Sequence, residues 1–329
     1  MNFPRPLVFL TAWMTLSLSV TLRAEEPAPA KSSAQAPRYT GLIWRVDGGK
    51  SPMFLAGAFH LMKPEDYPLP AAYTEAWQES RQVVFEVAPG EMEKPEVMRR
   101  IVSMGTLKGK KLQSMVSADT WKKLSEWGAK SGTPASALQS MQPWMAGLTV
   151  AVESFRAQGY QTQFGMEKFF ENQLPGSGKT AIGLETAVGQ IGIFTRIDPK
   201  QQEDVLRQSL EEAAQPEKIE ELITAWRTGD EAALHDRMHR SFKDFPDLEK
   251  TLLTDRNTAW IPALEKMLQG DQTTFVMVGA GHLCGPGSVV DLLGKKGYKP
   301  VRLLPSDQPA GAVESKPDAG PAPAVKKAA

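Results

Sequence analysis

The chain has 329 residues, enough to bury a sizeable core as one large domain or two small ones. Hydrophobic residues make up 41% of it, and 38 Lys and Arg side chains balance 38 Asp and Glu, so the formal net charge is zero. This balance gives no support for a nucleic-acid partner or an anionic membrane surface, because both attract basic proteins. The one cysteine excludes an intramolecular disulfide.

The two ends of the chain have compositions that do not suit a packed domain. Residues 1–24 combine a basic Arg5, an apolar run dotted with Ser and Thr, and a small-residue cleavage site, which is typical of a secretory signal peptide. An uncleaved anchor is the alternative, although the run is short and polar for a span of about 20 residues. Residues 25–38 and 306–329 are rich in Pro and Ala, which predicts a disordered linker and a disordered tail. We therefore expect a periplasmic or secreted protein with a folded domain at 39–305 and no stable transmembrane span after cleavage.

The folded part opens with strand signals. Apolar runs at 42–46 and 53–56 flank Asp-Gly-Gly-Lys, which predicts a β-hairpin. A helix is expected from Pro70 to about Ser80, followed by a third strand at 83–87.

The middle of the chain is rich in helix patterns, and its end returns to strands. Apolar spacing near 3.6 residues predicts helices at 92–104, 118–130, 142–158 and 165–174, and almost throughout 198–270, with breaks near Pro216, Gly229 and Pro246. Further strands are expected at 181–185, 275–278 and 300–304, with a helix at 288–296. These elements predict an α/β (α+β) fold, in which helices flank a central mixed β-sheet and a large helical insertion occupies about residues 90–270.

A short motif occurs twice and contains two of the four histidines. Residues 57–64 and 279–286 both read Gly-Ala-x-His-Leu-x-x-Pro, and each copy follows an apolar run. Glycine permits positive φ and close backbone approach, so each copy predicts a buried strand that ends in a tight turn with a histidine at its tip. If the two strands are neighbours, His60 and His282 meet at one edge of the sheet.

Glu86 is the natural third member of this site, because a carboxylate inside an apolar strand needs a cation or a donor nearby. Two histidines and a carboxylate are a common ligand set, so His60, His282 and Glu86 are candidate ligands of a divalent ion such as Mn²⁺, Co²⁺ or Zn²⁺. The alternatives are histidines that only cap the strand ends, and a Glu86 that pairs with an arginine or faces water.

Three more charged residues are candidates for catalysis. Glu167 and Glu185 each lie just after a glycine, in the expected short helix and in the fourth strand, and either is a candidate proton acceptor. Arg256 lies late in the helical region and can clamp a carboxylate or phosphate with its planar guanidinium. Its alternative is an ordinary solvated helix position.

The sequence resembles the TraB/PrgY/GumN family, which includes the animal Tiki proteins. The resemblance covers about Gly41 to Leu304. It rests on both Gly-x-x-His turns together with these stretches: 42–46, 67–70, 84–87, 165–167, 183–186, Arg256-Asn257 with Trp260, and 279–287. It implies a central sheet surrounded by helices, akin to ChaN and the erythromycin-esterase-like proteins. For the Tiki branch it implies a divalent-metal-dependent protease that uses both histidines and a strand glutamate.

Two function hypotheses follow. In the first, the protein is a metal-dependent hydrolase, foremost a metallopeptidase, acting on a peptide or small-molecule substrate. His60, His282 and Glu86 hold the metal, Glu167 or Glu185 takes the proton, and Arg256 orients the substrate or stabilises the oxyanion. In the second, the same cleft only binds a metal, haem or peptide, because a binding site needs the same ligands. The sequence leaves both open.

Overall fold

A mixed six-stranded sheet forms the centre of the protein, in a computed structural model that describes residues 39–243 and 246–304. The predicted signal peptide, linker and tail lie outside the described residues. The strand order is β4-β3-β5-β2-β1-β6. The strands are β1 (Leu42–Asp47), β2 (Met53–Ala58), β3 (Gln82–Val87), β4 (Thr180–Glu185), β5 (Thr274–Gly279) and β6 (Lys299–Arg302).

Four neighbouring strands of this sheet run in the same direction. β2 pairs with β5, β5 with β3, and β3 with β4, all in parallel, whereas β1 is antiparallel to both β2 and β6. Every residue of β2 and β5 is buried, as expected for parallel strands that are covered on both faces. The two repeated motifs therefore follow neighbouring strands, which is the condition under which His60 and His282 meet at one edge of the sheet.

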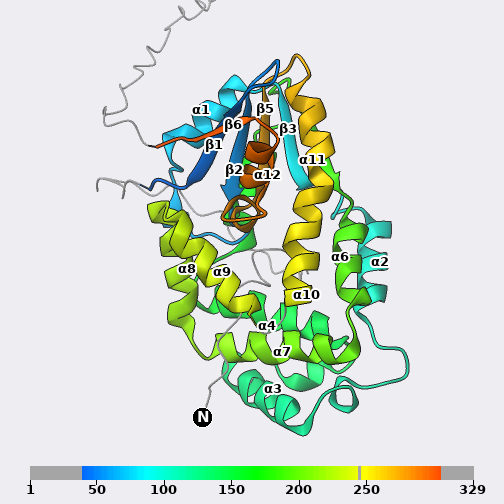
Figure 1. The fold of residues 1–329 in the computed structure, drawn as a ribbon. Helices are drawn as coiled ribbons and strands as arrows, with labels where there is room; N and C mark the ends of the chain where they lie inside the picture. Colours follow the sequence, from blue (N-terminus) through cyan, green and yellow to red (C-terminus); the bar gives the residue numbers. More distant parts are fainter. Residues whose placement is uncertain (1–38, 244–245, 305–329) are drawn as a thin grey trace, which may run out of the picture.

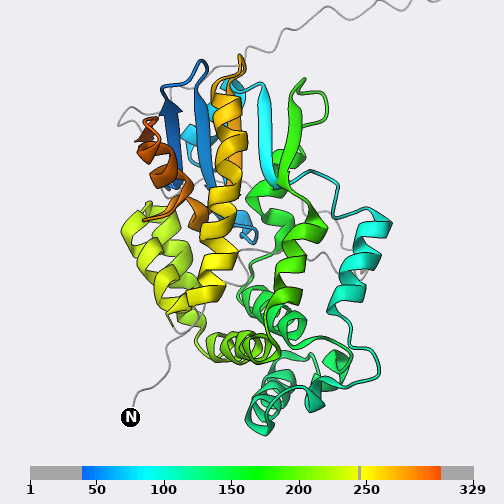
Figure 2. The same cartoon turned by 45° about the vertical axis from the view of Figure 1, so that its right-hand side comes forward.

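Helices cover both faces of the sheet and extend beyond its carboxyl edge. In Figures 1 and 2, α11 and α12 lie over one face, α1 lies on the other, and most of the remaining helices lie beyond the ends to which the parallel strands point. The helices are α1 (Ala71–Glu79), α2 (Pro95–Gly105), α3 (Ala118–Ser131), α4 (Pro143–Ala157), α5 (Met166–Glu171), α6 (Ala187–Arg196), α7 (Pro199–Ala213), α8 (Pro216–Thr228), α9 (Glu231–Phe242), α10 (Pro246–Glu249), α11 (Asp255–Leu268) and α12 (Val289–Lys295).

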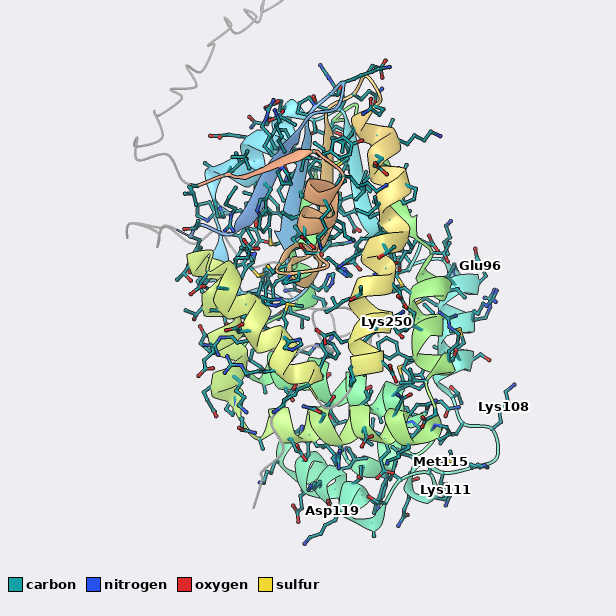
Figure 3. The ribbon with its side chains drawn as sticks, in the orientation of Figure 1. Glu96, Lys108, Lys111, Met115, Asp119 and Lys250 are labelled. Carbon is teal, nitrogen blue, oxygen red and sulfur yellow. The ribbon has the colours of Figure 1, made fainter. Side chains whose placement is uncertain are left out.

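The helices α3, α4 and α7 form a helical lobe with an apolar cluster of its own. This cluster is separate from the main core around the sheet and includes Leu112, Leu124, Val150 and Leu206. Figure 3 shows Lys108 and Lys111 on the outside of this lobe. Within the described residues, we find no helix with the length and apolar character needed to cross a membrane.

Most predicted elements are confirmed, including the hairpin between β1 and β2. The predicted helix breaks are also confirmed: α8 begins at Pro216, α10 begins at Pro246, and Gly229 ends α8 in the left-handed conformation at φ 69°. The helix α6 was not predicted. It follows β4 directly, and a Thr186 side chain caps its first turn by accepting from the Gly189 backbone N–H.

Candidate active site at the carboxyl edge of the sheet

Four of the predicted site residues come from four adjacent parallel strands. Glu86 is the penultimate residue of β3 and Glu185 is the last residue of β4. His60 lies two residues beyond β2, and His282 lies in the 3-10 turn Ala280–Leu283 after β5. Because the carboxyl ends of parallel strands meet at one edge, these four residues share a single edge of the sheet.

Arg256 joins the two strand carboxylates from the second position of α11. Its Nη2 donates to Glu86 Oε2 at 2.6 Å, and its Nε donates to Glu185 Oε1 at 2.7 Å. Trp260, one turn later, donates its indole Nε1–H to the same Glu185 oxygen at 2.8 Å. A π-helical turn, Lys250–Thr254, precedes α11, and its Leu252 carbonyl accepts from Arg256 Nη1. The helix thereby presents one buried cation to two acids.

His282 is held as a neutral, fully buried imidazole. Its Nδ1 contacts the Asn257 side-chain oxygen, and the Asn257 amide nitrogen donates to the Gly287 carbonyl, which fixes the orientation of the amide. Nδ1 therefore carries the proton, and Nε2 accepts from Arg256 Nη1 at 3.1 Å. Burial lowers the pKa of His282 well below its ordinary value, and the positive charge of Arg256 lowers it further.

Glu86 has partners on both of its carboxylate oxygens. Oε1 accepts from the Gly279 backbone N–H at 2.7 Å and lies 3.8 Å from His282 Nε2. Oε2 accepts from Gln190 Nε2 at 2.8 Å in addition to Arg256. Of the alternatives considered for Glu86, pairing with an arginine is the one that the structure contains.

His60 and Glu167 form a second buried pair. Their Nδ1 and Oε1 atoms are 2.8 Å apart but not aligned for a hydrogen bond, and the contact is an ion pair when His60 is protonated. Within the described residues, His60 Nε2 and both Glu167 oxygens are buried without a hydrogen-bond partner. Burial is the largest influence on the pKa of His60 and lowers it, but the contact with Glu167 and the charge of Glu86 together outweigh burial, and the net shift is upward.

Gly165 brings Glu167 to His60. A methyl group added at Gly165 would collide with the His60 carbonyl oxygen, so only glycine allows α5 to begin this close to the histidine turn. The next residue, Met166, donates its backbone N–H to the Phe59 carbonyl at 3.1 Å. Together these contacts explain the spacing of Gly165-Met166-Glu167.

A cavity of about 350 Å³ opens beside this pair. The described residues that line it include His60, Glu86, Glu167 and Gln190, but not Arg256, His282 or Glu185. Glu86 therefore has one side on the cavity and the other on Arg256. The site has two parts: an accessible part around His60 and Glu167, and a buried network behind Glu86.

The buried polar atoms allow a test of the predicted metal site. Across residues 39–243 and 246–304, no three His, Cys, Asp or Glu side chains are grouped as metal ligands. Arg256 supplies the positive charge that Glu86 and His282 contact. His60 and Glu167, by contrast, offer an imidazole nitrogen and a carboxylate of the types that bind divalent ions, and His60 Nε2 and Glu167 Oε2 have no hydrogen-bond partner among the described residues. These two residues fit such an ion, and the set of His60, His282 and Glu86 stays a prediction.

Comparison with known proteins identifies the family. A profile of the TraB/PrgY/gumN family matches residues 42–302. The chain belongs to the TraB/PrgY/gumN family. Searches of curated proteins and of solved structures returned no match. The matched range begins with β1 and ends with β6, so the TraB/PrgY/gumN domain includes all six strands and every residue of the candidate site.

Sequence reasoning missed one residue of the site in this TraB/PrgY/gumN protein. Gln190 lies on α6, bonds to Glu86 and lines the cavity. A polar Gln among Ile191, Ile193 and Phe194, just after a strand and a Thr cap, was the available signal. Asn257 and Trp260 were noted only through the family resemblance, and the structure places both against His282.

Proposed function

We propose that this TraB/PrgY/gumN protein is a metal-dependent hydrolase of the periplasm or cell exterior, and specifically a metallopeptidase. The observation that supports it is the buried His60–Glu167 pair beside the cavity, whose outer atoms, His60 Nε2 and Glu167 Oε2, lack hydrogen-bond partners among the described residues. Buried polar atoms in native proteins nearly always have a partner. A bound ion with its water is a partner of the right chemistry.

A divalent ion (Mn²⁺, Co²⁺ or Zn²⁺) held by His60 and Glu167 would lower the pKa of a bound water and polarise a substrate carbonyl. Glu86 and His282, the other predicted ligands, contact Arg256 in this arrangement. They join the ligand set only if Arg256 releases them.

The side chains of this site divide the remaining work. The Glu167 oxygen that does not hold the ion accepts a proton, and Glu167 is a better acceptor than Glu185 because it lines the cavity. Glu185 is held by Arg256 and Trp260, and burial raises its pKa despite those two donors. Arg256 acts through Glu86: it keeps this carboxylate in place at the cavity wall.

A binding protein without turnover is the second candidate, for a metal, haem or peptide. The contacts of Arg256 favour it, because they occupy Glu86 and His282 and leave His60 and Glu167 as the candidate metal ligands among the described residues.

Metal analysis combined with peptide cleavage tests the proposal. We expect the wild type to retain a divalent ion and to cleave members of a peptide library, and His60→Ala to lose both. His282→Ala tests whether that residue joins the ligand set. His239→Ala is the matched control, because His239 is exposed, contacts Glu249 and His235, and does not line the cavity. Equal metal content in the wild type, His60→Ala and His282→Ala contradicts the metal site. A metal-replete protein that binds peptides but cleaves none is the binding protein.

A further inference from the structure

The outer part of the cavity carries three charged residues that the proposed reaction does not use. Lys168 Nζ lies 3.3 Å from Glu93 Oε1 and 3.4 Å from Glu171 Oε2. These side chains are more exposed than those deeper in the cavity: 57% for Glu93 and 45% for Lys168, against 8% for His60. We call Glu93, Lys168 and Glu171 the rim.

Carboxylates outnumber basic groups in the cavity. Four carboxylates line it, those of Glu86, Glu93, Glu167 and Glu171, against the ammonium of Lys168 and the imidazole of His60. Arg256 offsets Glu86 from behind, whereas Glu93 and Glu171 share one lysine. Burial raises the pKa of Glu171, and Lys168 only partly counters it. The rim therefore retains an attraction for a second cation.

The rest of the wall is apolar, with Phe85, Val87, Ala88 and Met92 between the charged groups. Lysine and arginine have this same combination, an aliphatic stem that packs on apolar surface and a cationic head. An acidic group in a side-chain pocket selects basic residues in other proteases. His60 and Glu167 lie at the deeper end of the cavity, and their polar side-chain atoms are buried without hydrogen-bond partners in the described structure.

We propose that the rim is the specificity subsite of the cavity and selects peptides with a Lys or Arg side chain. The cationic head binds between Glu93 and Glu171, where Lys168 marks the position of an ammonium, and the stem packs on the apolar wall. Lys168 is then a built-in competitor that moderates the selectivity. This inference rests on the proposed function for its substrate class, and it concerns binding, which is measurable without turnover.

Equilibrium binding of matched fluorescent peptides to the full chain, purified with Mn²⁺, tests the subsite. A positional library places Arg, Lys, norleucine or Glu at one site at a time, and at one position we expect Arg and Lys to bind three- to tenfold more tightly than norleucine. Each ion pair near a surface contributes roughly two- to fivefold. Raising the salt concentration should shrink the preference, because exposed charges are screened.

Three variants separate the subsite from general damage. Glu171→Gln should reduce the preference for basic peptides, Lys168→Met should increase it, and Glu171→Lys should shift binding towards the Glu peptides. The shift is itself proof that Glu171→Lys is folded. Glu126→Gln is the control, because Glu126 is an exposed carboxylate on α3, in the helical lobe.

The outcomes for the two proposals are distinguishable. Tighter binding of Lys and Arg peptides without cleavage of any peptide supports the subsite and overturns the proposal that the protein is a hydrolase. Cleavage with equal binding of basic and norleucine peptides at every position overturns the subsite and leaves the hydrolase. A preference that Glu171→Lys leaves unchanged, or no peptide binding at all, also overturns the subsite.

Discussion

Arg256 and Glu86 form a buried ion pair across 170 residues of sequence, with Nη2 and Oε2 separated by 2.6 Å. The two side chains are 6% and 8% exposed. This contact fastens α11 to the end of β3 and holds Glu86 at the cavity wall. Breaking a buried pair is costly because the remaining charge is left without compensation in a poorly polarisable interior.

The first prediction concerns the stability of this pair. Arg256→Met should lower the free energy of unfolding by about 3–5 kcal/mol, because it leaves Glu86 and Glu185 buried without their cation. Arg256→Lys should recover only part of the loss, since a lysine cannot donate to both carboxylates with one planar group. Urea unfolding of the metal-free protein measures both. The matched double variant Glu86→Gln/Arg256→Met should lose less free energy of unfolding than the sum of the losses in the two single variants. If the two losses simply add, the two residues are not coupled.

The second prediction concerns the turn that carries His60. Gly165→Ala should destabilise the fold by about 1–3 kcal/mol and displace His60, because the added methyl collides with its carbonyl. Gly294→Ala is the matched control: a methyl there meets nothing within 4 Å, and the helix α12 should gain up to about 1 kcal/mol. Thermal unfolding and peptide cleavage measure both variants. Equal unfolding temperatures and equal cleavage rates for Gly165→Ala and Gly294→Ala would contradict the close packing of α5 on the histidine turn.

The third prediction assigns Gln190 a positioning role through its hydrogen bond to Glu86. Gln190→Glu places a second carboxylate beside Glu86, and because like charges disfavour each other's ionised form, the acid limb of the kcat/KM profile should move to higher pH. Gln190→Met should lower kcat/KM without moving that limb, since Glu86 keeps Arg256 and the Gly279 N–H. Identical pH profiles of kcat/KM in wild type and Gln190→Glu would show that Gln190 has no positioning role in the site.

The fourth prediction follows from the neutral burial of His282. The pKa of His282 lies well below the ordinary 6.5 in the folded protein. Below about pH 6.5, His282 is therefore protonated in the unfolded chain but stays neutral in the folded chain. The contribution of neutral His282 to the free energy of unfolding is thus fully present above pH 6.5. It is lost as the pH falls, with a slope of up to about 1.4 kcal/mol per pH unit. His60 opposes it, because its pKa is raised and its contribution is present at low pH and lost as the pH rises.

The variant His282→Gln isolates this effect. Urea unfolding with a chelator present should show that the stability gap between wild type and His282→Gln narrows from pH 7 to pH 5. A gap that is constant over this range would mean that His282 titrates normally in the folded protein.

The edge of the sheet could be predicted because its signals are local. Each Gly-Ala-x-His turn directly follows a strand, and Glu86 interrupts an apolar strand, so parallel pairing alone was enough to bring His60, His282 and Glu86 to one edge. The internal repeat made the two histidines recognisable from one sequence.

The partners of those residues could not be predicted, because their contacts join distant segments. Nothing local reports that Gly165 touches the His60 carbonyl, or that Gln190 reaches Glu86 across 104 residues. Arg256 was expected at the substrate, and its place behind Glu86 depends on how α11 packs against the sheet. The choice between an arginine and a metal as the cation of Glu86 is likewise a property of packing.

The rate of peptide cleavage by Glu167→Gln tests the central claim most directly, because this change keeps the shape of the side chain and removes its charge. If Glu167 is the proton acceptor of the site, kcat should fall by roughly 10²- to 10⁴-fold. The folded structure and the affinity for uncleaved peptides should remain close to those of the wild type. A Glu167→Gln protein that cleaves peptides at the wild-type rate would contradict the account.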